Sequence, residues 1–453
     1  MHMTLSLVAA LAPLCAPSVS QGDAKPWAEI LGPSRAQLPS PAKEVQWRGD
    51  VRAALAEARA SDRPLLVTLR CLPCKQCAGF DAAVLEGDGG LEALLAQFVT
   101  VRITSASDLD LRLFPVDGWQ DLDLSWWGWI LSPEGRIYSI FGGKDHIGDT
   151  TRISPEAFAN TLRRVLEHHY DPRRDAWDVD GPAPALGGKA PTPLSLPGFA
   201  SWEERGAQSL KKDGCLHCHQ VNEVLRQPAL DAGKFDKRRD LQPWPLPENI
   251  GLVVDRDDGL RVTKVVAGGA AEAAGVRVGD RLAAAGERKL FGQADLRGVL
   301  HRLSADANAV ELKAWRGSEL VSARLALAPG WRATELSWRK SIADGNIGAQ
   351  PGFAWPMAAK PELRRKLAIP AGKMAVTPWF GKETKDWPAW KAGLRDDDVI
   401  VAVGGESPDL AARDFMAWFR LRYEPGDALV LRVRDARGRE REVRYAAPAL
   451  GKH

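Results

Sequence analysis

The sequence predicts an α/β domain followed by two copies of a small β-rich module. At 453 residues the chain is too long for one hydrophobic core, so several domains are expected. Residues 47–170 carry the order helix, strand, two helices, three strands and a final helix. Further along, "AEAAGVRVGDRLAAAGE" (271–287) is matched by "AWKAGLRDDDVIVAVGGE" (389–406). Two copies indicate a repeated domain rather than a solenoid, which needs more repeats to bury its faces.

Each element of the α/β domain has its own local pattern. Residues 50–63 and 91–97 have helical periodicity, whereas residues 64–69 and 98–105 are short apolar or alternating runs typical of strands. The stretch "WWGWILSPEGRIYSIFGG" (126–143) predicts two strands joined by a Pro-Glu-Gly turn. The pattern therefore predicts a mixed sheet with helices packed against it.

The last helix of this domain has clear boundaries. Ser154 is a good cap and Pro155 suits the first turn, so a helix is expected to begin there. His168 and His169 close it, where polar or positive groups suit the helix dipole. We interpret these two histidines as surface residues rather than metal ligands.

Composition divides the rest of the chain. An apolar stretch from Leu5 to Pro17 has the length of a signal peptide core but lacks a basic start, so export to the periplasm or beyond is expected, with a disordered apolar tail as the alternative. The net charge of +3 gives no reason to expect nucleic acid as a partner, and no other segment is apolar enough to cross a membrane. The expected segments are a signal peptide (1–20), a leader (21–46), the α/β domain (47–170), a Pro/Gly linker (171–198), a helical Cys-x-x-Cys-His segment (199–246), β-rich module 1 (247–330), a connector (331–364) and β-rich module 2 (365–447).

The first cysteine cluster, "RCLPCKQC" (70–77), lies where a strand gives way to a helix. Backbone N–H groups at a helix start, with Arg70 nearby, favour the thiolate form of Cys71. Cys74 is then placed to form a disulfide with Cys71, and Cys77 falls on the same helix face as Cys74. We expect Cys71 and Cys74 to be catalytic and the Cys71 thiolate to be accessible. Alternatively, Cys71, Cys74 and Cys77 hold a soft metal such as copper without catalysis, or all three are structural thiols.

The second cluster, "CLHCHQV" (215–221), has the spacing of a c-type haem attachment site. Cys215 and Cys218 would bond the haem vinyl groups and His219 would ligate the iron. No methionine or histidine follows nearby as a distal ligand, so Met357, Met374 or His301 would have to fold back. A second disulfide or thiol relay and another metal remain the alternatives.

Residues 47–170 resemble the thioredoxin-like superfamily through the strand, Cys-x-x-Cys and helix arrangement. The resemblance implies thiol–disulfide exchange. Two departures stand out. Thioredoxins place an acid in the strand beneath the cysteines, and "PLLVTLR" has none; they also place a cis-proline before the following strand, where this sequence has Trp126 and Trp127. Loss of that proline favours the soft-metal alternative.

The repeated modules resemble PDZ domains of the bacterial envelope type. The resemblance implies that a peptide C-terminus joins an edge strand while loop N–H groups bind its carboxylate. In the first copy the peptide-binding residues would be Ile250, Gly251 and Leu252, with Leu252–Val254 as the pairing strand; Leu296, Val299 and Leu300 would line the helix side. In the second copy the loop is expected at 372–374. A fold kept for architecture alone is the alternative.

The whole architecture resembles a thioredoxin–PDZ (seleno)protein family of environmental bacteria. The matching stretches are "RCLPCKQC", "CLHCHQV", "PWPLPENIGL" and "LSWRKSIADGNIG". Some members carry selenocysteine in the redox motif, which favours a redox role. We therefore expect an exported thiol redox protein that binds protein or peptide clients. The alternatives are a metal-handling or scaffolding protein and a pure interaction protein.

Overall fold

The computed structural model describes the chain except residues 1–24, 73–74, 87–89, 117–120, 122, 124–125, 143–153, 205–215, 334–339, 344–346, 382–385 and 450–453. The expected signal peptide, Cys74 and Cys215 thus lie outside the described residues, as does the side chain of Cys77. None of the helices in the described ranges is long and apolar enough to cross a membrane.

The α/β domain follows the order of elements that the sequence predicts. Its four-stranded sheet has the order β2-β1-β3-β4, with β1 parallel to β2 and antiparallel to β3. Every residue of β1 is buried, so this strand is the centre of the domain. The elements are α2 (Val51–Ser61), β1 (Leu65–Leu69), α3 (Lys75–Phe80), the π-helical turn η1 (Asp81–Leu85), α4 (Glu92–Leu95), β2 (Val99–Ile103), the 3-10 turn η2 (Ala106–Asp108), β3 (Trp127–Leu131), β4 (Ile137–Gly142) and α5 (Pro155–His169).

Local chemistry explains where the two long helices begin. The Asp50 carboxylate accepts hydrogen bonds from the first N–H groups of α2, and the Ser154 hydroxyl accepts one from the backbone N–H of Ala157 at 3.0 Å in α5. Both caps satisfy N–H groups that have no partner inside the helix. The predicted hairpin is also confirmed, because β3 pairs antiparallel with β4.

The expectation that His168 and His169 lie on the surface is wrong. Both are buried at the end of α5, and burial lowers the pKa of each imidazole. Nε2 of His168 lies 2.8 Å from the Asp180 carboxylate, and Nδ1 of His169 lies 2.9 Å from the Tyr138 hydroxyl. Residues from other segments of the chain, such as Tyr138 and Asp180, cover this helix end. The position of the histidines in the helix therefore could not predict their burial.

The expected leader and linker both pack on the domains. Residues 25–46 include α1 (Trp27–Ile30), and residues 171–198 include α6 (Arg174–Trp177) and η3 (Pro193–Ser195). Ile30 and Trp177 bury their side chains in one small cluster. The Leu31 carbonyl accepts a hydrogen bond from the Trp315 indole at 2.9 Å, so the N-terminal segment bridges to the first β-rich module. We call residues 25–46 the N-terminal strap.

A helical segment follows and contains the Cys-x-x-Cys-His motif. Its elements are α7 (Phe199–Glu204), α9 (Cys218–Asp231) and α10 (Lys237–Asp240). Leu216, Val221 and Val224 are fully buried and join the same hydrophobic core as β1. Burial of these side chains stabilises the contact by about 1.5–3 kcal/mol each, so α9 is part of the α/β domain's packing.

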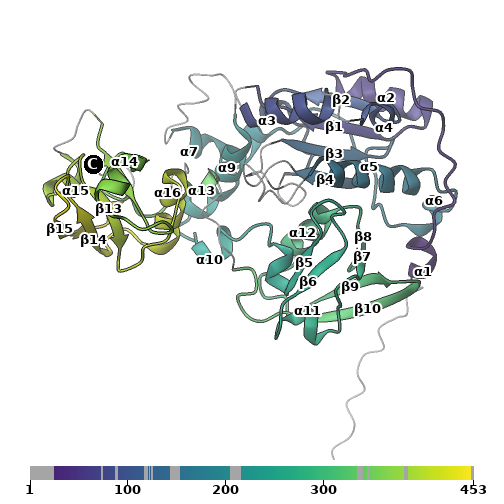
Figure 1. The fold of residues 1–453 in the computed structure, drawn as a ribbon. Coiled ribbons are helices and arrows are strands. Elements are labelled where there is room, and N and C mark those ends of the chain that lie inside the picture. Colours follow the sequence, from purple (N-terminus) through teal and green to yellow (C-terminus); the bar gives the residue numbers. More distant parts are fainter. Residues whose placement is uncertain are drawn as a thin grey trace, which may run out of the picture.

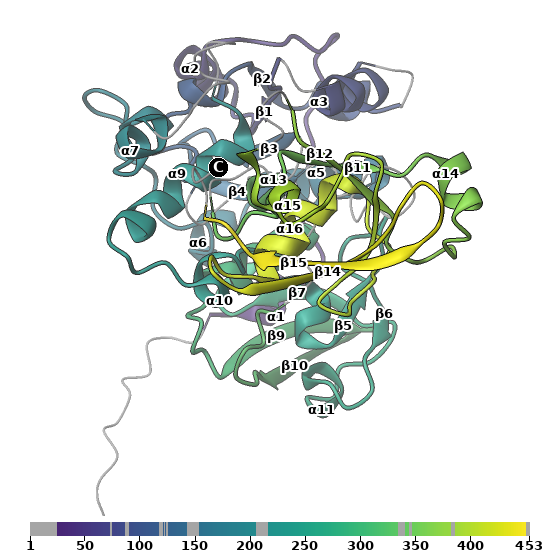
Figure 2. The ribbon, with the colours of Figure 1, turned by 90° about the vertical axis from the view of Figure 1, so that its left-hand side faces the viewer.

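Two β-rich modules complete the chain, and they share one topology (Figures 1 and 2). The sheet of module 2 runs β11-β12-β13-β14-β15; in module 1 the equivalent order is β5-β6-β7-β9-β10, with a bridge from Arg261 to Arg281 joining its two halves. Module 1 contains η4 (Pro247–Ile250), β5 (Leu252–Val254), β6 (Val262–Val265), α11 (Ala270–Ala273), β7 (Arg281–Ala285), β8 (Arg288–Lys289), α12 (Gln293–Arg302), β9 (Ala309–Arg316) and β10 (Glu319–Ala326). Module 2 contains β11 (Trp355–Ala358), α14 (Pro361–Lys366), β12 (Val376–Trp379), α15 (Pro388–Lys391), β13 (Val399–Val403), α16 (Ala412–Arg422), β14 (Ala428–Arg434) and β15 (Glu440–Ala446), and α13 (Lys340–Ala343) precedes it.

Two glycines identify the equivalent loops of the modules. Gly251 and Gly352 both have positive φ, at 84° and 74°. A Cβ on Gly251 would lie 3.4 Å from the Ala271 backbone nitrogen, and one on Gly352 would lie 3.1 Å from that of Ala389. Ala271 and Ala389 are paired in the sequence repeat, so the two glycines occupy the same place, before the first strand of each module.

The loop of module 2 therefore precedes β11, not β12. The sequence-based placement at Gly372–Met374 is wrong, and Met374 is fully buried in the module's core. Helix α14 is inserted between β11 and β12, while module 1 has no helix between β5 and β6. That insertion moves the first strand further upstream than spacing from the repeat suggests.

A buried ion pair joins module 1 to the α/β domain. Nη2 of Arg297 in α12 lies 2.6 Å from the Asp121 carboxylate, and both side chains are 3% exposed. The same guanidinium donates to the Trp244 carbonyl at 3.1 Å. Removing one charge from a buried pair leaves the other without compensation, which is the costly case.

Arg297→Met should lower the free energy of unfolding by about 3 kcal/mol, because it leaves the Asp121 carboxylate buried without its cation. Urea unfolding followed by tryptophan fluorescence measures the change. The matched control is Arg324→Met, which removes a cation from an ion pair on the exposed face of β10. The control should change stability by less than about 1 kcal/mol; equal effects of both variants would contradict a special role for the buried pair.

Candidate functional site

Cys71 lies directly after the central strand β1 and before α3, as the sequence predicts. The neighbouring Arg70 N–H donates to the Ile103 carbonyl at 2.9 Å, which holds the strand end in register with β2. Cys71 itself is only 3% exposed and belongs to the main hydrophobic core. The expectation of an accessible thiolate at Cys71 therefore differs from the structure, in which another part of the chain covers the sulfur.

That covering residue is His217, from the Cys-x-x-Cys-His motif. Its Nδ1 lies 3.6 Å from the Sγ of Cys71, although the two residues are 146 positions apart in sequence. In the neutral state the thiol can donate to the imidazole; after proton transfer the imidazolium donates to the thiolate. The two cysteine motifs thus meet at one site, and sequence analysis missed His217 because motif spacing gave His219 the role.

Helix α9 fixes the position of His217. The His217 N–H donates to the Gln220 side-chain oxygen at 2.8 Å, so His217 is the cap and Cys218 the first residue of this 14-residue helix. The positive end of the helix dipole favours the thiolate form of a cysteine placed there. Cys218 is 9% exposed and lies in the same core as Cys71. His219 stacks on His217 with ring centroids 5.7 Å apart.

A buried acid contacts Arg70, the residue before Cys71. Asp81, at the start of η1, is 1% exposed, and its Oδ1 accepts a hydrogen bond from the Trp126 indole at 3.0 Å. Oδ2 of Asp81 lies 3.0 Å from Nε of Arg70, the residue before Cys71. Burial raises the pKa of Asp81, although the Arg102 guanidinium opposes that effect. The Asp81 carboxylate therefore links the helical turn after the cysteines to Arg70 and Trp126.

Trp126 has an unusual backbone at the place where thioredoxins carry their cis-proline. Its φ is +81°, a left-handed value that is strained for a bulky residue. The side chain is 1% exposed and its ring centroid lies 4.4 Å from that of Phe80 in α3. Packing on Phe80 and the hydrogen bond to Asp81 therefore hold a conformation that the backbone alone would disfavour.

Asp123, just before Trp126, ties α9 in place. Its Oδ2 accepts hydrogen bonds from the Asn222 amide of α9 and from the Ser341 hydroxyl of α13, both at 2.9 Å. Arg226 of α9 donates to the Ser341 carbonyl at 2.6 Å. Charge-assisted hydrogen bonds of this kind are stronger and more directional than neutral ones. The loop before β3 thus connects the α/β domain to α9 and to α13, the helix that precedes module 2.

The described residues test the metal and haem predictions only in part. Within the ranges that the structure describes, no group of three or more His, Cys, Asp or Glu side chains could hold a metal ion. That statement does not reach Cys74, Cys215 or the side chain of Cys77. His301, one of the distal ligands considered, stacks on Trp244 with ring centroids 4.8 Å apart, and its Nδ1 accepts the Trp244 N–H.

The two methionines are no better placed as distal ligands. Met374 is fully buried in the core of module 2. Met357 is half exposed on β11. Cys218 is buried in the main hydrophobic core, and Cys215 lies outside the described residues, so the haem stays a prediction.

The peptide-binding residues expected in module 1 lie at the start of an edge strand. Ile250 and Leu252 are fully buried, and Gly251 adopts a left-handed conformation between them. Strand β5 pairs with β6, and its other edge has no strand partner among the described residues. On α12, Leu296 and Leu300 are buried in the module's core, while Val299 is partly exposed.

Comparison with known proteins identifies part of this architecture. No curated protein matches the chain. Among solved structures, an HtrA-type protease with a decapeptide aligns at 19% identity with a TM-score of 0.19, covering 30% of this chain and 40% of that chain. The alignment thus covers less than half of that protein's length, and a TM-score this low does not indicate a shared fold. The family model described as "Thioredoxin-like" matches residues 46–114, which run from before α2 to Phe114 and include Cys71. Residues 46–114 therefore belong to a thioredoxin-like domain.

Proposed function

We propose that this protein is a thiol–disulfide redox protein in which electrons pass between the Cys71/Cys74 pair and the Cys215/Cys218 pair. The observation that carries the proposal is the 3.6 Å contact between Cys71 Sγ and His217 Nδ1, which brings the two motifs together. The thioredoxin-like domain at residues 46–114 supports thiol redox chemistry. This reaction would make the protein a thiol–disulfide oxidoreductase in which one exchange step takes place between two cysteine pairs of the same chain.

The proposed exchange is balanced in atoms and electrons. The Cys71 thiolate attacks Cys218 of an oxidised Cys215–Cys218 pair; a Cys71–Cys218 bond forms and Cys215 leaves as thiolate. The Cys74 thiolate then attacks Cys71, so Cys218 leaves and the Cys71–Cys74 disulfide forms. The first pair has lost two electrons and the second has gained them. The same steps run backwards when the relative potentials are reversed.

His217 acts as proton acceptor and donor in this proposal. Its imidazole takes the proton from the Cys71 thiol, and the resulting imidazolium stabilises the thiolate. Because Cys71 is buried and His217 is partly buried, water screens this attraction less than it would at the surface. When Cys218 or Cys215 leaves as a thiolate, we infer that the same imidazolium returns the proton.

Burial of Cys71 favours an internal first partner over an external one. A client disulfide could reach a 3% exposed sulfur only if the start of α9 moved away. The Asn222 and Arg226 contacts of α9 oppose such movement. We infer that client disulfides react with Cys215 or with Cys74. The exchange between Cys71 and Cys218 then takes place within the chain.

A covalent c-type haem at Cys215, Cys218 and His219 is the second candidate. The motif spacing supports it, whereas the burial of Cys218 in the main hydrophobic core argues against it. A soft metal held by Cys71, Cys74 and Cys77 is the third. Either group would occupy thiols that the internal exchange requires, so trapping of the exchange, a haem spectrum and metal analysis of the wild-type protein together separate the three candidates.

We further propose export to the periplasm or beyond, and peptide-binding, PDZ-type roles for the two β-rich modules. The apolar stretch at Leu5–Pro17 supports export. The shared topology of the modules and the edge position of β5 support peptide binding. The modules would hold protein clients close to the redox site, which raises their effective concentration there.

The double variant Cys74→Ser, Cys215→Ser should accumulate a disulfide between Cys71 and Cys218, because neither resolving thiol remains to break it. Mild oxidation followed by non-reducing digestion and mass spectrometry would detect the linked peptides. Cys77→Ser added to the double variant is the control and should leave the linkage unchanged. Absence of the linkage would overturn the internal relay, and a pyridine haemochrome band in wild-type protein from haem-maturing cells would replace it with the haem candidate.

His217→Asn should shift the pH midpoint of Cys71 alkylation upward by about 1 unit, because the nearby imidazolium no longer favours the thiolate. Asparagine is a good helix cap, so the start of α9 should be kept. Mass spectrometry of the Cys71 peptide across a pH series measures the midpoint. His219→Asn, which changes the stacked neighbour, is the matched control; an equal shift in both variants would rule out a specific His217–Cys71 pair.

A peptide with a free C-terminal carboxylate should bind module 1, and amidation of its C-terminus should abolish binding, because the loop N–H groups recognise the carboxylate. Fluorescence polarisation with a C-terminal peptide library measures both forms. Gly251→Val should weaken binding at least tenfold, since a side chain at φ 84° strains this loop. Equal binding of free and amidated peptides would count against PDZ-type recognition.

A further inference from the structure

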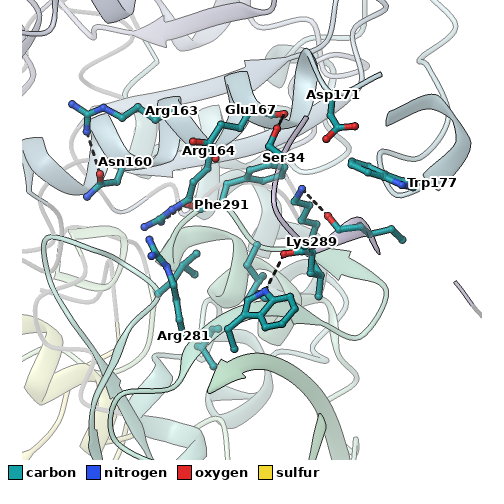
Figure 3. A pocket seen from close by; sticks show the side chains of 18 residues that line it. Ser34, Asn160, Arg163, Arg164, Glu167, Asp171, Trp177, Arg281, Lys289 and Phe291 are labelled. Carbon is teal, nitrogen blue, oxygen red and sulfur yellow. Dashed lines mark hydrogen bonds between the residues drawn. The ribbon is translucent and has the colours of Figure 1, made fainter. Parts of the chain in front are cut away.

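A cavity of about 380 Å³ lies between α5, the N-terminal strap and strands β7 and β8 of module 1 (Figure 3). Its size falls in the range of about 300–1,000 Å³ that is usual for small-molecule sites. It is separate from the cysteines, since its walls come from α5, the strap and module 1. The cavity thus lies at a boundary between two domains, where ligand sites often occur.

Lys289 is the key cation of this cavity. Its Nζ lies 3.2 Å from the Ile30 carbonyl and 3.4 Å from Nδ1 of His168. Because Nε2 of His168 contacts the Asp180 carboxylate, Nε2 holds the proton and Nδ1 is left as an acceptor. Both direct partners of the ammonium are therefore uncharged. An ammonium has three N–H donors, so one remains for a ligand in the cavity.

Arginines add positive charge to the same wall. Arg164 and Arg281 both contact the Asp258 carboxylate, at 3.2 and 2.9 Å, so one carboxylate serves two guanidinium groups. Arg163 also lines the cavity, where its guanidinium donates to the Asn160 side chain. These three arginines and Lys289 outnumber the two acids on the wall, Glu167 and Asp171, and Asp171 is already paired with Arg173 at 2.6 Å. The cavity therefore carries excess positive charge.

Aromatic side chains form the other part of the wall. The Lys289 ammonium lies 5.2 Å from the ring centroid of Trp177 and 5.7 Å from that of Phe291. Trp315 also lines the cavity, while its indole donates to the strap. A ligand here would meet cations and flat apolar surfaces next to one another (Figure 3).

We propose that this cavity binds a small organic anion, whose carboxylate or phosphate group contacts Lys289 and Arg281 and whose apolar body packs on Trp177 and Phe291. The binding of an anion compensates a partly buried ammonium that has no direct carboxylate partner among the described residues. The proposal does not depend on the thiol chemistry. Because the strap closes one side, a bound anion would also hold residues 30–34 against module 1.

Binding should weaken above pH 8. Burial lowers the pKa of Lys289 to about 8, so the ammonium loses its charge as the pH rises through that value. The other charged groups that influence Lys289 are the carboxylates of Asp180, Asp171 and Glu167 and the guanidinium of Arg173. His168 does not add a charge in this range, because burial lowers its pKa.

The test is calorimetric titration of the full chain with phenyl phosphate, benzoate and inorganic phosphate. We expect saturable binding of at least one ring-bearing anion and weaker binding of inorganic phosphate, which cannot use the aromatic wall. Lys289→Met and Arg281→Gln should each weaken binding about tenfold, since each removes one charge-assisted contact. Lys264→Met, on exposed β6 of the same module, is the matched control and should bind as the wild type does.

Arg281 is exposed, so its variant keeps the test valid if Lys289→Met fails to fold. Comparison of phenyl phosphate with benzoate shows which anionic group the cavity prefers. Lack of saturable binding for every probe at millimolar concentration would overturn the proposal. Unchanged affinity in folded Arg281→Gln and Lys289→Met protein, or affinity that does not fall between pH 7 and pH 9, would overturn it as well.

Discussion

The packing of the start of α9 on the end of β1 is the constraint on which the rest of the site depends. It places a partly buried imidazole 3.6 Å from the buried Cys71 sulfur. Excluding water strengthens the attraction between a thiolate and an imidazolium, but it also denies large substrates direct access. A thioredoxin-like domain with this cover is suited to exchange with a partner carried on the same chain.

Several separate contacts hold α9 in that position. Apolar side chains of the helix join the core of the α/β domain, and Asp123 receives hydrogen bonds from both α9 and α13. The loop that contains Asp123 also contains Asp121, which is paired with Arg297 of module 1. The loop before β3 therefore links the surroundings of α9 to module 1 through Asp121 and to α13, which precedes module 2, through Asp123.

The sequence predicted the elements of the α/β domain because their signals are local. Ser154 caps α5, and the Pro-Glu-Gly turn separates β3 from β4, as expected. The repeat also predicted two modules of one topology. It misplaced the second loop because α14 lengthens the connection after β11, and spacing within a repeat cannot show where an insertion lies.

Only some residues of the candidate site could be predicted from the sequence, and the reason is different. Cys71 and Cys218 were found from motif spacing, which is a property of short segments. His217 and Asp81 were missed because their roles depend on contacts with residues far away in sequence or on another element. The burial of His168 and His169 was missed in the same way, since it depends on residues that return to cover α5.

The strained backbone at Trp126 shows how these parts act together. A left-handed tryptophan persists only where surrounding contacts overcome its cost, of order 1–3 kcal/mol. Here Phe80, Asp81 and the tethered loop supply those contacts, and Asp81 also contacts Arg70, the residue before Cys71. Loosening α9 would therefore weaken the restraint on Trp126, and relaxation of Trp126 would move the Asp81 carboxylate that contacts Arg70. Access to the thiol and the electrostatics of the site should change together, because the same packing determines both.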